Sequence, residues 1–299
     1  MEQRHGLEQI QGAELSWGRR LLMCPPDEFG IEYSINPWMN VDHGVDVVRA
    51  HRQWQTLRDT LIAAGATVEV LPAQPGVPDL VFTANAGLVD GDRFAVATFR
   101  HEQRQPERIA TAQWFGDHGF DVEALPAPLV QEGAGDALPF RDRLVAGYAQ
   151  RSGRTAYDYL ARVNDLAIQP VRLVDPRLYH LDIVFCPLDD RSALVVPSGM
   201  ASDDARALIA AIPDPIIVEH SDALHFVANS VVVGRAVVMP HVPREIGHAL
   251  EARGFSVVEC PMSEFQKAGG ACRCLTLALD VDLPRRSRVA MRRASGRIA

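Results

Sequence analysis

Five helical stretches over 283 residues, on average one for every 55 to 60 residues, constrain the fold of this chain more than any other feature. Apolar residues recur at helical spacing over Val45–Ala64, Gln105–His118, Thr155–Asn164, Asp203–Ala211 and Pro243–Arg253. Gly65, Gly119 and Gly254 follow three of these stretches, where glycine commonly caps a helix C-terminus. The regular spacing indicates a repeated supersecondary unit.

Short runs rich in Val, Ile and Leu lie between the helices and predict strands. They are Thr67–Leu71, Arg93–Thr98, Leu144–Gly147, Asp182–Cys186, Ala193–Val196, Ile216–Glu219, Ser230–Val233, Ala236–Met239 and Ser256–Glu259. Because neither a linker nor a change in composition precedes Pro284, we expect one α/β domain over residues 1–283. Residues 284–299 carry six Arg and no acid, and are expected to form a basic, flexible tail.

The basic residues are unusual, because 29 of the 30 are Arg and only Lys267 is lysine. A phosphate-binding P-loop and a Schiff-base enzyme both need a suitably placed lysine, and the sequence around Lys267 fits neither. Residues 1–283 hold 24 basic and 38 acidic side chains, a net charge of −14. An acidic body argues against nucleic-acid binding and is compatible with a cationic ligand.

The sequence also predicts a cytoplasmic protein without metal or cofactor. Residues 1–12 lack the apolar core of a secretory signal, and no apolar run approaches the roughly 18 residues of a membrane span. The five cysteines show no disulfide spacing. Neither Cys-x-x-Cys nor a closely spaced His pair suggests zinc.

Four polar segments follow predicted strand ends: Pro78–Gly87, Gln131–Asp136, Tyr179–Asp182 and Gly269–Leu277. Each alone is a weak signal, because a Glu-Gly turn, a single His or a single Cys is usually structural. Together they contain a cysteine, a histidine, several carboxylates and an amide, which form a complete nucleophilic set. The excess of carboxylates suits a planar cation with many hydrogen-bond donors, and guanidinium is that group.

These segments resemble, in order, the Pro-Asp-x-x-Phe-x-x-Asp/Asn, Glu-Gly-x-Gly-Asp, His-x-Asp and Gly-Gly-x-x-x-Cys motifs of the guanidine-modifying pentein superfamily. Glu32–Met39 and Phe99–Arg104 are further matches, so the resemblance covers roughly residues 20–283. It implies a pseudo-fivefold α/β propeller of ββαβ units with its site at the centre. That expectation agrees with the helix spacing.

The resemblance also implies roles for the site residues. Cys274, which is followed by Leu275-Thr276 as in the superfamily, is the expected nucleophile in preference to Cys272. His180 is the expected proton carrier. Glu132 and Asp182 are expected to hold the guanidinium, with Asp79 behind them. Asp136 is expected to hold the Glu132 turn in place.

An amino-acid substrate also needs a partner for its α-carboxylate. By the same resemblance we expect Arg104 and Arg151 to bind it, with Arg100 and Arg154 as the alternatives.

Asn85 stands where deiminases and dimethylarginine dimethylaminohydrolases usually have Asp. An amide both accepts from a guanidinium and donates to a urea carbonyl, so a ureido intermediate can stay bound for a second attack. The expected reaction is therefore that of an arginine dihydrolase, yielding ornithine, two ammonia and carbon dioxide through a covalent S-alkylthiouronium intermediate.

Several alternatives stay open at this point. A dimethylarginine dimethylaminohydrolase or an arginine deiminase would stop at citrulline, and an amidinotransferase would need an amine acceptor. A non-catalytic arginine sensor is the alternative from another class, although a pure binder needs no nucleophile. The expected partner is a small guanidino compound, with no nucleic acid and no membrane, and a homo-oligomer is left open.

Overall fold

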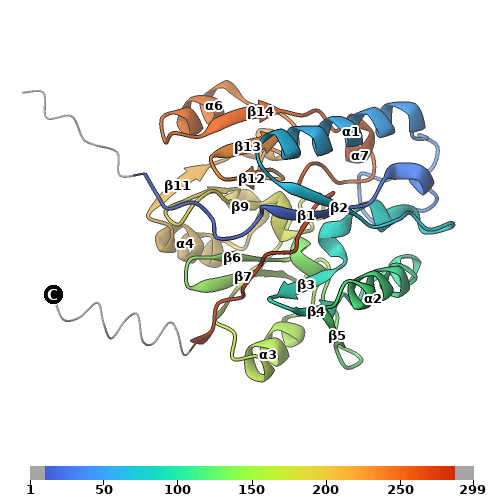
Figure 1. The fold of residues 1–299 in the computed structure, drawn as a ribbon. Coiled ribbons are helices and arrows are strands. Elements are labelled where there is room, and N and C mark those ends of the chain that lie inside the picture. Colours follow the sequence, from blue (N-terminus) through green and yellow to red (C-terminus); the bar gives the residue numbers. More distant parts are fainter. Residues whose placement is uncertain (1–10, 287–299) are drawn as a thin grey trace, which may run out of the picture.

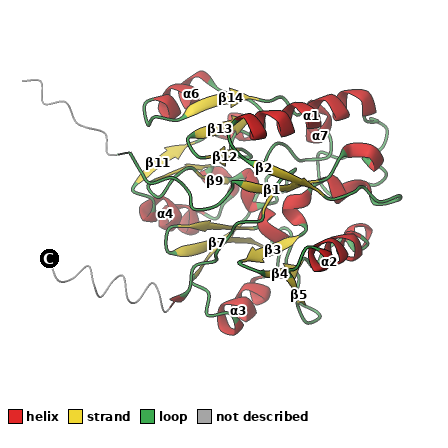
Figure 2. Ribbon diagram, viewed as in Figure 1, coloured by secondary structure: helices red, strands yellow, loops and turns green. Residues whose placement is uncertain are grey.

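This computed structural model describes residues 11–286. Five three-stranded sheets, all built in the same way, form the framework of this part of the chain. In each sheet two strands pair antiparallel, and a third strand, reached through a helix, pairs parallel to the second. Figures 1 and 2 show the main helices on the outside, with the strands between them. The repeated unit that the helix spacing predicted is therefore present, in a mixed α/β domain.

Four units follow one another along the chain. They are β3 (Gly87–Asp90), β4 (Arg93–Val96), α2 (Glu107–Asp117) and β5 (Asp121–Ala124); β6 (Ala137–Phe140), β7 (Arg143–Tyr148), α3 (Arg154–Val163) and β8 (Ile168–Arg172); β9 (Phe185–Pro187), β10 (Ser192–Val195), α4 (Ser202–Ala211) and β11 (Asp214–Ile217); and β12 (Val231–Val233), β13 (Ala236–Met239), α6 (Arg244–Glu251) and β14 (Ser256–Glu259). Two single-turn helices, α5 (His220–Ala223) and α7 (Ser263–Gln266), lie in connections.

The fifth unit joins distant parts of the chain. Strand β15 (Leu277–Ala278) pairs antiparallel with β1 (Arg20–Met23), which leads into α1 (Val47–Ala63) and β2 (Thr67–Val70). Strand β15, near the end of the described chain, therefore completes the sheet that contains β1, near its beginning. This pairing makes the described fold depend on both of its ends.

Burial differs between the first and third strands of the units. The first strands β3, β6, β9, β12 and β15 are almost entirely buried, whereas β2, β5 and β14 are half-buried or exposed along their whole length. Buried apolar strands belong in a core, and partly polar strands at an edge. The segments that lead into the first strands therefore lie deep in the molecule, where the candidate site is found.

The sequence-based prediction of the helices is confirmed, since all five are present within two residues of the expected bounds. Gly65, Gly119 and Gly254 have φ angles of +101°, +84° and +78°, as expected for glycines that end helices. The predicted strand Asp182–Cys186 is wrong at its start. A 3-10 helix, Leu181–Ile183, occupies that part, and β9 begins only at Phe185.

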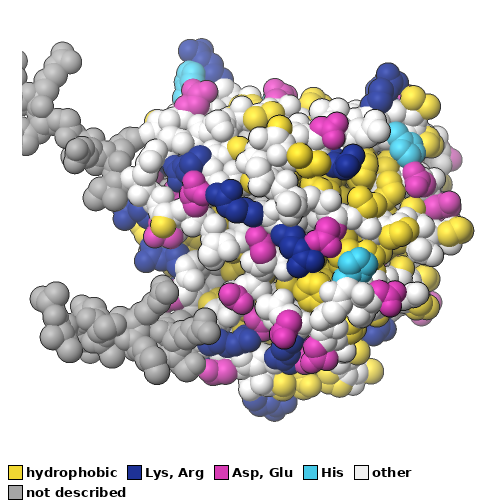
Figure 3. All heavy atoms as spheres, in the orientation of Figure 1, with side chains coloured by type: hydrophobic (Ala, Val, Ile, Leu, Met, Phe, Trp, Pro, Cys, Tyr) yellow, Lys and Arg dark blue, Asp and Glu magenta, His cyan; other side chains and the backbone are white. Residues whose placement is uncertain are grey.

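The described part of the predicted tail contacts the domain. Arg285 forms a β-bridge with Leu166 and pairs with Asp90, and the Arg286 amide donates to the Asp165 carbonyl over 2.8 Å. Residues 287–299 lie outside the described residues, so the flexible tail stays a prediction. No helix within residues 11–286 is long and apolar enough to cross a membrane. On the face that Figure 3 shows, acidic and basic side chains are interspersed.

Phe115 of α2 offers a test of this packing. Its ring is fully buried and stacks on Phe94 of β4, with 3.5 Å between the ring centroids. Phe115→Ala is expected to lower the free energy of unfolding by about 3–5 kcal/mol in urea denaturation, because a large cavity replaces the ring. Ile109→Ala, on the same helix but 75% exposed, should change it by less than about 0.5 kcal/mol. Equal effects of the two substitutions would contradict the described packing of α2.

Candidate active site

A buried turn precedes the first strand of each unit, and hydrogen bonds connect these turns. The turns contain Asn85, Glu132, Asp182, Asn229 and Cys274. The Asn85 amide donates to the Glu132 carbonyl over 3.0 Å, and the Asn229 amide donates to the Asp182 carbonyl over 3.2 Å. The Ala84 amide donates to the Cys274 carbonyl over 3.1 Å, which links the last turn to the first. Residues far apart in the sequence therefore meet at one place.

Cys274 supplies the thiol where these turns meet, and the residue is 3% exposed. Its thiol lies 3.5 Å from Asp182 Oδ2, to which it donates, and it accepts a hydrogen bond from Asn229 Nδ2 over 3.1 Å. Burial and the Asp182 carboxylate raise the pKa of the thiol well above its ordinary value, whereas the Asn229 bond lowers it. In the described state Cys274 is therefore a neutral thiol, and a nearby cation would favour the thiolate.

His180 and Glu132 form a second buried group. His180 Nε2 lies 2.9 Å from Glu132 Oε2, and Arg151 Nη1 donates to the same oxygen over 3.2 Å. The other oxygen, Oε1, accepts from the backbone amide of Arg100 over 2.9 Å. Burial alone would raise the pKa of Glu132, but the His180 hydrogen bond and the Arg151 charge hold it well below its usual range. Glu132 is thus an ionised carboxylate that orients the imidazole.

Asp136 holds the Glu132 turn from behind. Ser152 Oγ donates to Asp136 Oδ2 over 2.6 Å, and the Leu181 amide donates to Oδ1 over 3.1 Å. Ser152 Oγ in turn accepts from the Glu132 amide over 2.9 Å. Asp136 therefore holds the Glu132 turn, as expected, and in addition connects it to the segment that carries His180.

Asn85 is held by contacts on both sides of its amide. Its Oδ1 accepts from Arg104 Nη1 over 3.0 Å while its Nδ2 donates to the Glu132 carbonyl. Glu107 binds Arg104 through two hydrogen bonds of 2.6 and 2.8 Å, which keeps this buried guanidinium in place. Since only an N–H can serve the Glu132 carbonyl, the contacts determine the orientation of the Asn85 amide. Within residues 11–286, the other N–H of Asn85 Nδ2 has no hydrogen-bond partner and is open to a ligand.

Two carboxylates keep an oxygen without a hydrogen-bond partner among the described residues. These oxygens are Asp79 Oδ1 and Asp182 Oδ1, and both residues are almost fully buried. The other oxygen of Asp79 accepts from Tyr33 Oη over 2.9 Å. Burial raises the pKa of Asp79 above its ordinary value and that of Asp182 to about 7. Asp79 Oδ2 also lies 3.8 Å from Arg104 Nε, but each carboxylate keeps one oxygen that a cationic ligand can pair with.

Close contacts require glycine at two positions of the site. A Cβ at Gly135 would lie 2.2 Å from Asn85 Nδ2, and one at Gly270 would lie 2.4 Å from the Phe82 ring. Neither distance is possible without moving the turn that carries Asn85 or the ring beside Cys274. The Gly-x-Gly and Gly-Gly parts of the motifs are thus explained by steric fit.

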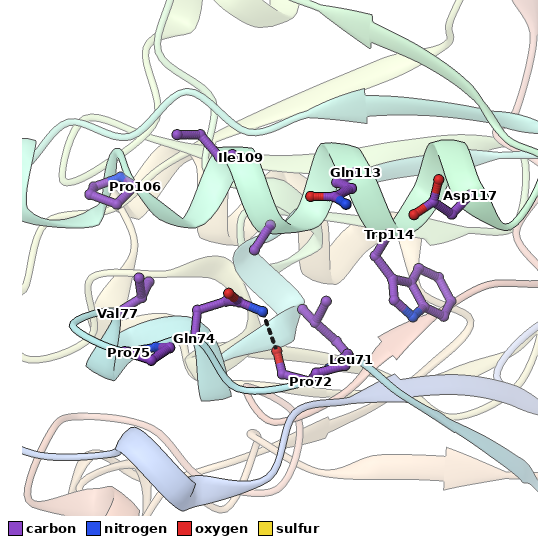
Figure 4. A pocket seen from close by; sticks show the side chains of 11 residues that line it. Leu71, Pro72, Gln74, Pro75, Val77, Pro106, Ile109, Gln113, Trp114 and Asp117 are labelled. Carbon is purple, nitrogen blue, oxygen red and sulfur yellow. Dashed lines mark hydrogen bonds between the residues drawn. The ribbon is translucent and has the colours of Figure 1, made fainter.

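A small cavity lies beside both Cys274 and His180. It is lined by Asp79, Asn85, Arg104, Arg151, His180 and Cys274 among others, and its volume is about 10 Å³, room for roughly one water molecule. Ile35 and Asn36 cover it from the segment before α1. A larger groove of about 380 Å³ lies elsewhere, between residues 71–77 and α2, and contains none of these groups (Figure 4). The chemistry therefore belongs to the small cavity.

The structure brings together all eight residues that the sequence predicted for the site. Six line the cavity, while Glu132 and Asp182 contact His180 and Cys274 from beside it. The alternatives Arg100 and Arg154 do not line it, since Arg154 pairs with Asp158 on the surface. Cys272 is buried, with its thiol 3.5 Å from the Cys260 carbonyl. Within residues 11–286 no cluster of His, Cys, Asp or Glu is suited to hold a metal ion.

Four residues of the site were not predicted from the sequence: Asn229, Asn36, Glu107 and Tyr179. Asn229 contacts the sulfur, Asn36 lines the cavity, and Glu107 holds Arg104. Tyr179 lies under Arg151, with the guanidinium 4.6 Å from the centre of its ring. One signal was available: Asn229 comes directly before the strand Ser230–Val233, as the other motifs precede theirs.

Comparison with known proteins gives several relatives, although no family model matches. The chain is 43% identical over 263 residues to the bifunctional arginine dihydrolase/ornithine cyclodeaminase ArgZ of Synechocystis, and spans 37% of that protein's length. It is 38% identical over 261 residues to the N(G),N(G)-dimethylarginine dimethylaminohydrolase of Mycobacterium tuberculosis, covering 87% of this chain and 86% of the relative.

Solved structures agree with these sequence relatives. The N-terminal domain of ArgZ bound to product, described as an arginine dihydrolase, matches with a TM-score of 0.84 and 41% identity, over 88% of this chain and 97% of that one. A dimethylarginine dimethylaminohydrolase adduct matches with a TM-score of 0.72 at 19% identity, which supports the fold alone.

Asp182 gives a test of the site that needs no substrate. Between about pH 4 and 7 its carboxyl is ionised in the unfolded chain and protonated in the folded one, so this group makes stability fall as pH rises through that window. Asp182→Asn removes the effect, because its amide stays neutral. The melting temperature of the variant should therefore rise relative to wild type by several degrees between pH 4 and pH 8, measured by calorimetry.

Asp59→Asn is the matched control, since the Asp59 side chain is 71% exposed. Its melting temperature should follow that of wild type at every pH. A constant difference between Asp182→Asn and wild type across the pH range would contradict the protonated state of Asp182.

Proposed function

Because this chain belongs to the guanidine-modifying superfamily that includes arginine dihydrolases and dimethylarginine dimethylaminohydrolases, we propose that it hydrolyses the guanidino group of arginine twice. The observation that carries the proposal is Asn85, an amide held beside Cys274 and the buried carboxylates. The proposal concerns only the guanidino chemistry, since the chain spans 37% of the bifunctional relative.

The proposal includes the arrangement of the fold. We take residues 1–283 as the catalytic domain, with its five units placed as a pseudo-fivefold propeller around the site. The five connected turns and the buried first strands support this arrangement.

The guanidinium is proposed to bind between the carboxylates. Asp79 and Asp182 each have an oxygen free to accept, and a planar guanidinium carries donors on several sides. Pairing with this cation would ionise Asp182, because an adjacent positive charge lowers a carboxyl pKa. The same cation beside the sulfur favours the Cys274 thiolate, with Asp182 Oδ2 placed to take the thiol proton.

The first hydrolysis then follows from the described contacts. Cys274 attacks the guanidino carbon, and His180, oriented by Glu132, protonates the nitrogen that leaves as ammonia. An S-alkylthiouronium remains on the sulfur. His180 next takes a proton from water, which attacks the same carbon and releases the thiolate. The product at this stage is a ureido group.

The second hydrolysis depends on retaining that neutral group. The remaining N–H of Asn85 can donate to the ureido oxygen, whereas a carboxylate at this position would repel it. A second attack by Cys274 releases the second ammonia, and water cleaves the resulting S-acyl group to a carbamate. The carbamate decomposes, so arginine and two water molecules give ornithine, two ammonia and carbon dioxide.

Arg151 is the favoured partner of the substrate's α-carboxylate. It uses one N–H for Glu132 and one for the Ile35 carbonyl, which leaves three of its five. Arg104 directs four contacts to Glu107, Asn85 and the Asp79 carbonyl, which leaves one N–H. We therefore assign Arg151 the larger part of carboxylate binding, with Arg104 assisting and holding Asn85.

A dimethylarginine dimethylaminohydrolase is the second candidate, favoured by the 38% identity to the Mycobacterium tuberculosis enzyme over nearly its whole length. That reaction would stop at citrulline and release dimethylamine. Asn85 argues for the dihydrolase, and product analysis separates the two.

Product stoichiometry is the direct test. Incubation with arginine should give ornithine and two ammonia per arginine, and Cys274→Ser should give neither. Asn85→Asp should shift the product toward citrulline with one ammonia, because its carboxylate replaces the remaining donor. Since the variant also places an oxygen against the Glu132 carbonyl, the measured quantity is the product ratio, not the rate.

Asn40→Asp, an exposed substitution, is the control and should leave the ratio unchanged. Citrulline accumulation by wild type would contradict the dihydrolase proposal. Dimethylamine released from dimethylarginine would favour the second candidate.

The role of Arg151 can be tested with agmatine, which is arginine without its carboxylate. Arg151→Lys should lower kcat/KM for arginine relative to agmatine roughly 10- to 100-fold, because charged hydrogen bonds to the carboxylate are lost. Arg154→Lys, at an exposed ion pair, should leave the arginine-to-agmatine ratio as in wild type. Equal losses for both substrates in Arg151→Lys would instead assign this residue to orienting Glu132.

A further inference from the structure

We propose that Asn229 is a further catalytic residue, whose fixed side-chain amide donates a hydrogen bond to the sulfur of Cys274. The inference rests on the proposed function in taking Cys274 as the nucleophile. Asn229 lies in the bend before β12, is fully buried, and comes from the one unit that contributed no predicted site residue. It is not among the residues that line the cavity. It therefore acts on the sulfur and not on the substrate.

Four contacts hold the Asn229 amide. Its Oδ1 accepts from the backbone amides of Arg273 and Cys274, over 3.0 and 3.2 Å. Its Nδ2 donates to the Asp182 carbonyl over 3.2 Å and to Cys274 Sγ over 3.1 Å. The two backbone amides can only donate, so they require an oxygen on their side of the side chain. The NH₂ group must then face the sulfur.

The Asn229 N–H stabilises the thiolate form of Cys274 more than its thiol form. A thiolate accepts a hydrogen bond more strongly than a thiol, and a donor fixed before the reaction needs no reorganisation when charge develops. Burial and the Asp182 carboxylate both raise the pKa of Cys274, and among the side chains Asn229 opposes them. The same N–H stabilises the sulfur each time it leaves as a thiolate. In the proposed reaction that happens twice per arginine.

Other groups around the sulfur are the same in wild type and variant, but Asn229 also lowers the pKa of Asp182, so losing it weakens the Asp182 charge and works against the expected rise. The charged or titratable side chains nearest Cys274 are Asp182, Tyr179, Cys272 and Arg273, and those on the rest of the cavity wall are Asp79, Arg104, Arg151 and His180.

The test is the pH dependence of Cys274 alkylation by iodoacetamide, followed by intact mass in the full chain. Asn229→Ser keeps an oxygen for the backbone amides and loses the N–H to the sulfur. We expect its alkylation midpoint to rise by about one pH unit and kcat/KM for arginine to fall about 100-fold. Asn229→Asp, nearly the same in shape, should raise the midpoint further, because its second oxygen faces the sulfur.

Ser230→Ala is the matched control, since the neighbouring Ser230 hydroxyl donates to the Val227 carbonyl and not to the site. Its alkylation midpoint should equal that of wild type, and Cys274→Ser should show no corresponding labelling. A folded Asn229→Ser with the wild-type midpoint would overturn the proposal, because a purely structural role lowers turnover without moving that midpoint.

A measurement without substitution at Asn229 covers the case in which its variants fail to fold. The side-chain ¹⁵N resonance of Asn229 should titrate with the Cys274 thiol in wild type and not in Cys274→Ser. A resonance that is independent of pH in both would overturn the inference. Neither readout needs turnover, so a protein that shows the shift but does not hydrolyse arginine would refute the proposed function alone.

Discussion

The buried Glu132 carboxylate is the group on which the rest of the site depends. One of its oxygens holds His180 and Arg151, the other holds the Arg100 amide, and its own backbone carbonyl holds Asn85. A carboxylate without water must be paired to stay ionised, and this one is paired on every side. Removing it would release the imidazole and a guanidinium together and leave both without their carboxylate. The position of His180 is thus inseparable from that of Arg151, the proposed partner of the substrate's carboxylate.

Two other carboxylates of the site have the opposite electrostatic design. Asp79 and Asp182 are buried with an unpartnered oxygen each, and burial raises both of their pKa values. Such groups destabilise a folded protein at neutral pH unless a ligand pairs with them. In the proposed reaction a guanidinium supplies that partner, and its charge favours the thiolate of Cys274. Substrate binding and activation of the proposed nucleophile are then coupled through the same carboxylates.

Helix periodicity was enough to predict the repeated unit, because apolar residues recur at helical spacing in each outer helix, although α2 also buries Glu107 and Thr111. The first strands were harder to predict. Strands such as β3 and β15 have two to four residues and are buried on both faces, so no alternation marks them. Asp182–Ile183 was assigned to a strand for a related reason. Its apolar neighbours suit β-structure, but a hydrogen bond from the Val184 amide to the Leu181 carbonyl closes a turn there.

The sequence by itself determined the set of reactive groups and their order: a cysteine after a Gly-Gly turn, a histidine, spaced carboxylates and Asn85 in place of an acid. Residue chemistry and spacing are enough for the set of groups, whereas the reading of Asn85 as a replaced acid is implied by the resemblance to the guanidine-modifying superfamily. Only the tertiary structure decided which groups are paired and which are open, since most of those contacts join residues far apart in the chain, such as Arg104 with Asn85 and Cys274 with Asp182. Glu132 and Asp182 are both acids in motifs. Glu132 is paired with His180 and Arg151, whereas Asp182 keeps one oxygen without a partner among the described residues. Asn229 had no motif at all, and its contact with the sulfur exists because the turn before β12 is packed against the turn before β15.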